Sequence, residues 1–195
     1  MNRIEKTEET VRALYGQEAS PLRAAAPAPL RRGGEKMIVW QLILYCLLFT
    51  GMVKLAVRGG AVDGLFFYPR SVQERAVELG LSDEKTIRRR FKRFMTIFYA
   101  GMAAALVLIV GLWNRAADFW SAYWQSLLFL EVMNWYDGIV IDELWVGRSG
   151  FWVIPELADM PYVQTWPQML RKRALLSLVW VAGAALTAGL AVLLF

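Results

Sequence analysis

The sequence predicts an all-α fold, a four-span transmembrane helical bundle with an amphipathic cytoplasmic helix between spans one and two. Of the 195 residues, 57% are hydrophobic, which is high for a soluble domain. These residues gather in four runs, at about 37–57, 94–113, 119–147 and 174–195. Each run can cross a hydrocarbon core of roughly 30 Å at about 1.5 Å per residue, and none alternates as a membrane β-strand does.

The connections between the runs predict how the spans follow one another. Spans two and three are joined by little more than "NRAAD" (114–118), which predicts an antiparallel hairpin. In the first connection, Ser82 before two acidic residues is typical of an N-cap, so we expect a helix continuing unbroken into span two. The segment "RSVQERAVEL" (70–79) has apolar residues at helical spacing and is predicted to lie on the membrane surface. Thr165 and Pro167 are predicted as N-cap and N1 of the last helix.

Lys and Arg residues predict the orientation, because they are enriched in cytoplasmic loops. The first connection, 58–93, contains nine of them, whereas the short second connection contains Arg115 alone. We therefore expect both basic connections in the cytoplasm and the C-terminus outside, in a cell membrane. Juxtamembrane charge accounts for these residues, so the expected partner is the lipid bilayer and no nucleic acid.

Residues 1–36 are predicted as an N-terminal tail that precedes the bundle of residues 37–195. One account is a genuine tail, since "IEKTEETVRALYG" (4–16) has apolar residues at helical spacing. The account we favour is that synthesis starts at Met37. The stretch "RRGGEK" (31–36) can be encoded by a purine-rich run before that methionine, as a bacterial ribosome-binding site would be. No cleavable signal peptide is expected, because the first apolar run is too long.

The third apolar run carries the candidate site residues. Glu131 is predicted near the middle of the membrane, with Asn134 just below it. Asp137 is predicted near the cytoplasmic interface and Asp142 in the headgroup zone. A polar stripe in a membrane helix is expected to face other helices or a wet cavity, because a charge exposed to lipid is costly. On an α-helical wheel these residues share one side, with Asp137 at its edge.

Lys54 is predicted inside span one at the level of Asp137, so the two are candidate ion-pair partners. Snorkelling of Lys54 to the inner surface is the alternative. The remaining candidate partners of Glu131 are Asn134, Tyr45, Gln41, Thr96 or a shared proton. The stripe can also serve only as hydrogen-bonded contact between helices, and small residues four apart permit close packing in the bundle, in a homodimer or with another membrane protein.

The missing residue types restrict the chemistry. Histidine is absent and Cys46 is the single cysteine, which excludes imidazole metal ligands, Ser-His and Cys-His nucleophile pairs, and an intramolecular disulfide. An oxygen-only Mg²⁺ site would need Glu143, which the helical wheel turns away from Asp137 and Asp142. No metal ion and no cofactor are therefore predicted.

Three functions from different classes fit these residues. The first is a binding or accessory protein that holds a lipid, a small molecule or a partner helix at the acidic stripe. The second is a proton-coupled small transporter that uses Glu131. The third is an inner-leaflet lipid-headgroup enzyme that uses Asp137 and Asp142, with Arg90 and Arg148 binding phosphate. We expect the first, and hence a protein that is not an enzyme.

Three motifs, "YPRSVQERAVELGL" (68–81), "YDGIVIDELWVG" (136–147) and "FWVIPELADMPY" (151–162), resemble a family of small, uncharacterised bacterial integral membrane proteins. The matching residues are Tyr68, Pro69, Val72, Gln73, Arg75, Asp137, Asp142, Ile154 and Pro155. The resemblance covers about residue 37 to the C-terminus. It implies the membrane topology but no particular activity.

Overall fold

The computed structural model describes residues 32–195, with side chains from Lys36 onward. Within this range the chain is all-helical and has no strand, as predicted. The expectations for residues 1–31, including a helix over residues 4–16, lie outside the described residues.

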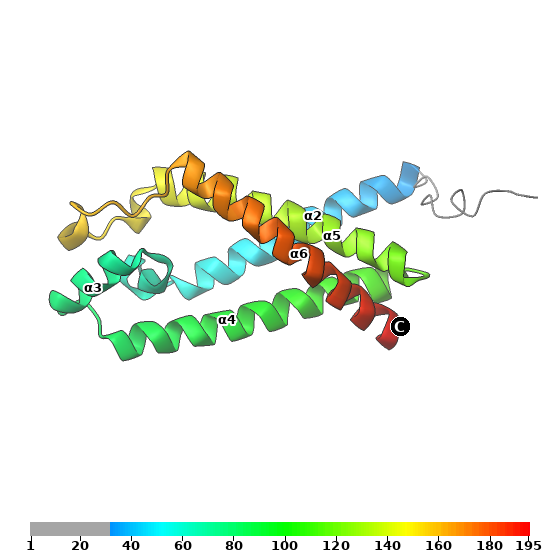
Figure 1. Ribbon diagram of the computed structural model, residues 1–195, viewed down its shortest axis with the longest axis horizontal. Helices are drawn as coiled ribbons and strands as arrows, with labels where there is room; N and C mark the ends of the chain where they lie inside the picture. The colour runs from blue at the N-terminus through cyan, green and yellow to red at the C-terminus, as the bar shows by residue number, and fades with distance from the viewer. Residues whose placement is uncertain (1–31) are drawn as a thin grey trace, which may run out of the picture. The chain divides into compact units, whose positions relative to one another are not determined.

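Four long helical stretches make up the body of residues 36–195 (Figure 1). They are α2 (Arg32–Ala56), α4 (Glu84–Val107) with the π-helix η3 (Leu108–Trp113), α5 (Phe119–Tyr136) with the π-helix η4 (Asp137–Val146), and α6 (Trp166–Leu194). The hairpin between η3 and α5 lies at the same end of the body as the C-terminus, whereas the two longer connections lie at the other end. The closest-packed pair of helices is α5 and α6.

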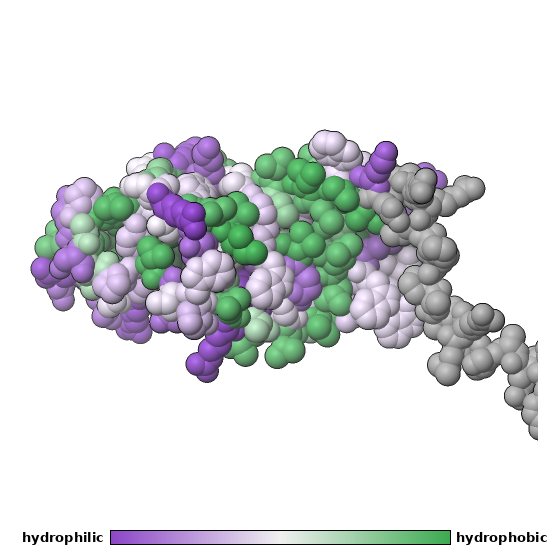
Figure 2. Space-filling model, turned by 90° about the horizontal axis from the view of Figure 1, so that it is seen from above, coloured by the Kyte–Doolittle hydropathy of each residue, from purple (hydrophilic) through white to green (hydrophobic). Residues whose placement is uncertain are grey.

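Three helices are long and apolar enough to cross a membrane, namely Lys36–Ala56, Glu84–Trp113 and Trp166–Leu194. They correspond to the predicted spans one, two and four. The helix formed by α5 and η4 is also long, but its polar residues lower its hydropathy, so it does not qualify by composition. Figure 2 shows apolar surface gathered over part of the body and hydrophilic residues more frequent at the α3 end.

The first connection contains the 3-10 helix η2 (Ala61–Phe67) and α3 (Arg70–Glu78). The predicted amphipathic helix is therefore present, and it ends at Glu78, two residues before Gly80, whose φ of +71° favours glycine. Its apolar residues Val72 and Ala76 are buried, because α3 packs on η2, on α4 and on η6 (Pro155–Leu157) in the third connection. This face is covered by the protein, and the placement of α3 on a membrane surface stays a prediction.

Each predicted helix start differs from the structure at one residue. The N-cap of α4 is Asp83 instead of Ser82, because the extended Asp83 backbone lets its Oδ1 accept a hydrogen bond from the Thr86 N–H at 2.9 Å. From there the helix runs unbroken through η3, as predicted. The N-cap of α6 is Thr165, as predicted, but α6 begins at Trp166, so Pro167 is the second residue of the helix.

The Asp83 cap gives a pH-dependent prediction. Its hydrogen bonds with Thr86 hold the pKa of Asp83 below the usual value. A lowered folded-state pKa means that the cap stabilises fully above the ordinary Asp pKa of about 3.9 and that this contribution is lost as the pH falls through the lowered value. We expect hydrogen exchange of the first turn of α4, corrected for intrinsic rates, to accelerate only below about pH 4.

Asp83→Asn is the matched control, because Asn caps helices as well as Asp but does not titrate. Asp83→Ala should show fast exchange at every pH. If the Asn variant keeps the same pH dependence as the natural protein, Asp83 is not the titrating group.

Candidate functional site

A buried arginine from α6 lies between two aspartates of η4. The Arg173 side chain is 1% exposed. Its Nη1 donates a hydrogen bond to Asp137 Oδ2 at 2.6 Å, and its Nη2 donates to Asp142 Oδ2. The Lys172 Nζ lies 3.3 Å from the same Asp142 oxygen. The two acids and two bases together carry no net formal charge. Pairing of this kind lowers the free-energy cost of burying charged side chains.

The winding of η4 brings the two aspartates onto one face. Asp137 and Asp142 are five residues apart in a segment that is π-helical. A π-helix forms i→i+5 hydrogen bonds, so residues five apart lie about one turn apart and point in similar directions. Both carboxylates can therefore reach a single guanidinium. The helical wheel assumed α geometry and left Asp137 at the edge of the stripe.

Gly138 permits the close approach of α6 to η4. A Cβ at this position would lie 2.9 Å from Arg173 Nε and 3.0 Å from Met169 Sδ. Gly138 and Met169 are both buried. The contact between the two helices therefore depends on the absence of a side chain at residue 138.

A chain of hydrogen bonds continues from this cluster along α5. Asn134 Nδ2 donates to the Arg173 carbonyl at 3.0 Å and to Ser177 Oγ at 3.2 Å. Ser177 Oγ in turn donates to Glu131 Oε2 at 2.6 Å. Glu131 is partly buried and Asn134 is 1% exposed. The acidic stripe thus faces α6 along its whole length.

The structure does not form the expected ion pair between Lys54 and Asp137. Arg173 pairs with Asp137 instead, and Lys54 is exposed on α2. The sequence predicts span four at about 174–195, which leaves Arg173 just before it. Since α6 starts at Trp166, Arg173 lies about 10 Å into the helix. The Thr165 capping pattern was the signal that could have revealed this.

The partners expected for Glu131 also differ. Tyr45 donates its hydroxyl to the Met102 carbonyl at 3.3 Å, and Gln41 Nε2 donates to Asn114 Oδ1 at 2.7 Å. Thr96 is exposed on α4. Asn134 reaches Glu131 through Ser177, a residue that the sequence analysis did not single out.

The two arginines expected to bind phosphate are engaged elsewhere. Arg90 Nη1 lies 2.7 Å from Asp63 Oδ1, and Arg148 Nη2 lies 3.7 Å from Glu143 Oε1. Neither arginine is among the described residues that line the cavity beside the aspartates.

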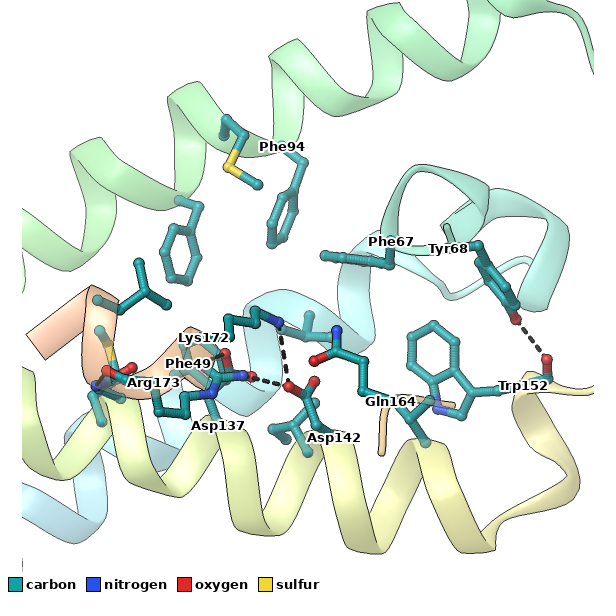
Figure 3. A pocket seen from close by; sticks show the side chains of 18 of the residues that line it. Phe49, Phe67, Tyr68, Phe94, Asp137, Asp142, Trp152, Gln164, Lys172 and Arg173 are labelled. Carbon is teal, nitrogen blue, oxygen red and sulfur yellow. Dashed lines mark hydrogen bonds and ion pairs between the residues drawn. The ribbon is translucent and has the colours of Figure 1, made fainter. Parts of the chain in front are cut away.

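A cavity of about 280 Å³ adjoins the ionic cluster (Figure 3). Its polar wall contains Asn134, Asp137, Asp142, Gln164, Lys172 and Arg173. Its aromatic wall contains Phe49, Phe67, Tyr68, Phe94, Phe98 and Trp152. In Figure 3, Phe94 and Phe67 lie across the cavity from Lys172 and Asp142. Sequence reasoning missed the aromatic wall, because its members come from four separate elements.

The first and third connections meet at this cavity. The Tyr68 hydroxyl donates to the Trp152 carbonyl at 2.6 Å, which joins the end of η2 to η5 (Gly150–Trp152). Burial, with a smaller effect of Tyr162, raises the pKa of Tyr68 well above its ordinary value, so the donor stays protonated. The hydrogen bond fixes the aromatic side of the cavity.

One edge of the cavity reaches the surface between α4 and α6. Met95 and Tyr99 on α4 line it, as do Leu176 and Trp180 on α6. Tyr99 is 56% exposed. Glu131 is not among the described residues that line the cavity. The cavity therefore adjoins the part of the stripe from Asn134 to Asp142, and Tyr99 gives it an exposed edge.

Comparisons with protein-family models, with curated proteins and with solved structures find no match to this chain.

The ionic cluster gives a stability prediction. Arg173→Met would leave Asp137 and Asp142 without their buried partner, and breaking a buried pair in this way costs about 3–5 kcal/mol. The neighbouring Arg171→Met is the control, since Arg171 is exposed and should change stability by less than about 0.5 kcal/mol. Thermal unfolding in detergent measures both. Equal stability of the two variants would contradict the structural role of Arg173.

The contact at Gly138 gives a second prediction. Gly138→Ala should destabilise the protein by about 1–3 kcal/mol, because its Cβ would force Arg173 and Met169 to move. Gly51→Ala on α2 is the control, since a Cβ there meets nothing within 4 Å. That variant should instead gain about 0.5–1 kcal/mol from helix propensity. A Gly138 variant as stable as the Gly51 variant would contradict close packing at residue 138.

Proposed function

We propose that this chain is a four-span protein of the cell membrane that binds an amphipathic, lipid-like molecule in the cavity between α2, α4, η4 and α6. It is a binding or accessory protein in this proposal, without a reaction of its own. The observation that carries the proposal is one cavity with a charged wall and an aromatic wall facing each other.

The outward surface of α5 and η4 supports a fourth span. Its polar residues turn toward α6, as the hydrogen bonds of Glu131, Asn134 and Asp137 show. Large apolar residues are exposed one or two helical turns apart, namely Trp120, Trp124, Leu128, Trp135, Ile139 and Leu144. Glu131 lies between Leu128 and Trp135, with its carboxylate hydrogen-bonded to Ser177. A helix with a largely apolar outer face suits contact with lipid, even though its mean hydropathy is modest.

The positive-inside rule supports the proposed orientation, with the two basic connections in the cytoplasm and the C-terminus outside. The charged wall of the cavity then lies toward the inner leaflet. The resemblance to a family of small bacterial membrane proteins belongs to the same proposal. Three of the residues that carry this resemblance, Tyr68, Asp137 and Asp142, line the cavity, which supports the proposal.

The two walls of the cavity match the two parts of an amphiphile. A polar group would lie against Asp142, Lys172 and Gln164, and a hydrocarbon portion against Phe94 and Phe98. Because the charged wall has equal numbers of acids and bases, it favours a zwitterionic or uncharged polar group over a strongly charged one. The open edge beside Tyr99 gives hydrocarbon tails access to the bilayer.

The alternative functions have less support from the geometry. A carrier working through Glu131 would need this carboxyl in the cavity, but it is hydrogen-bonded to Ser177 outside the cavity lining. An inner-leaflet enzyme would need free carboxylates, but Asp137 and Asp142 are both engaged by Arg173.

A cavity-filling variant tests the proposal. Met95→Trp and, on the other helix, Leu176→Trp place a large ring in the cavity without changing its charge. Each variant is purified in mild detergent, and retained lipid is extracted and quantified by mass spectrometry. We expect the natural protein to retain a lipid-like molecule in a fixed ratio and both variants to lose most of it.

Ile97→Trp is the matched control, because Ile97 lies two residues from Met95 but is 54% exposed and does not line the cavity. It should retain lipid at the natural level. If a thermally stable Met95→Trp or Leu176→Trp protein retains as much lipid as the control, the cavity is not the binding site.

A further inference from the structure

The first turns of α4 carry a row of basic residues with few acidic neighbours. Lys85, Arg89, Lys92 and Arg93 are spaced four, three and one residues apart, which places them along one face of an α-helix. All four are exposed. We call this set the basic stripe. The sole acid of α4 is Glu84, at its first turn.

The ion pairs of the described residues leave the basic stripe free. Six basic side chains are paired with acids, namely Arg70, Arg75, Arg90, Arg148, Lys172 and Arg173. No member of the basic stripe forms an ion pair with a described residue. The Arg89 guanidinium makes one long hydrogen bond, of 3.4 Å, to Thr86 Oγ1. Neighbouring Arg90, by contrast, turns inward to Asp63.

The basic stripe points away from the protein body. Ile87 and Phe98, the buried residues of this helix that are nearest to the stripe, lie on the opposite side by helical spacing. The stripe is therefore separate from the cavity, whose α4 lining comes from residues 94, 95, 98 and 99. A ligand at the stripe and a ligand in the cavity would not share side chains.

The length of α4 and η3 places the stripe at the membrane surface. The helix Glu84–Trp113 has 30 residues and is about 45 Å long, whereas the hydrocarbon core is roughly 30 Å thick. With Trp113 at the outer interface, roughly the first ten residues extend beyond the hydrocarbon. Arg89, Lys92 and Arg93 then lie in the headgroup layer, and Lys85 lies at its aqueous edge.

We propose that the basic stripe is a second lipid site, which binds the phosphate groups of anionic lipids in the inner leaflet. Guanidinium and ammonium groups recognise phosphate oxygens through charge-assisted hydrogen bonds. Their position in the headgroup layer favours a lipid over an acidic protein, which would approach from the aqueous side. The assignment of the leaflet rests on the orientation proposed above, but the binding chemistry does not depend on the cavity.

Native mass spectrometry in detergent tests this site, with phosphatidylglycerol as the anionic probe and phosphatidylcholine as the zwitterionic one. Arg89→Gln combined with Arg93→Gln should weaken phosphatidylglycerol binding roughly tenfold or more, because each juxtamembrane charge contributes substantially. Phosphatidylcholine binding should not change. Added salt should weaken phosphatidylglycerol binding to the natural protein.

Arg70→Gln combined with Arg75→Gln is the matched control. It removes the same formal charge, but from residues of α3 that are already paired with Glu74 and Glu78. It should bind phosphatidylglycerol as the natural protein does. The proposal is overturned if both double variants weaken equally, if neither weakens, or if poly-glutamate displaces phosphatidylglycerol at equal charge concentration.

The same samples separate this site from the cavity. The molecule retained in the cavity should persist in the Arg89 and Arg93 double variant. If Met95→Trp fails to reduce lipid retention while the stripe still prefers phosphatidylglycerol, the proposed function fails and the second site stands. If Met95→Trp reduces lipid retention while the stripe shows no preference for phosphatidylglycerol, the second site alone is ruled out.

Discussion

Burial of a guanidinium costs several kcal/mol unless acids compensate it, and the arrangement of the helices around Arg173 follows from that cost. Compensation requires two carboxylates on one side of a helix, and η4 presents Asp137 and Asp142 in that way because it is π-wound. Close approach of α6 requires a residue without a side chain, which is Gly138. Charge, helix winding and packing therefore meet in one short segment.

This cluster also bears on the proposal that the polar helix formed by α5 and η4 is a fourth membrane span. Glu131, Asn134, Asp137 and Asp142 each form a hydrogen bond with α6, which offsets part of the cost of placing them away from water, while the buried Asn134 Oδ1 has no partner among the described residues. The pairing leaves the polar wall charge-balanced, and the aromatic side chains of the other elements complete an amphipathic enclosure beside it.

Hydrophobic runs and turn patterns were sufficient to predict the helices, because length and hydropathy depend only on local sequence. The candidate site was harder to predict from the sequence. The four acids were visible as anomalies in an apolar run, but Arg173 and Ser177, the partners of three of them, lie 31 to 46 residues further along the chain. Helical wheels assume α geometry, and the π-winding of η4 has no clear sequence signal. The aromatic wall depends on long-range packing of separate elements and could not be read from spacing.

The hydrogen bond between Tyr68 and the Trp152 carbonyl connects two segments 84 residues apart in the chain. Together with the packing of α3 on η6, this hydrogen bond joins the first and third connections beside the cavity. For the lipid-like ligand proposed above, exchange would proceed past the exposed Tyr99, sideways within the plane of the bilayer. Loading would then be governed by two-dimensional diffusion among neighbouring lipids, and a compound of negligible aqueous solubility would meet no kinetic barrier from water.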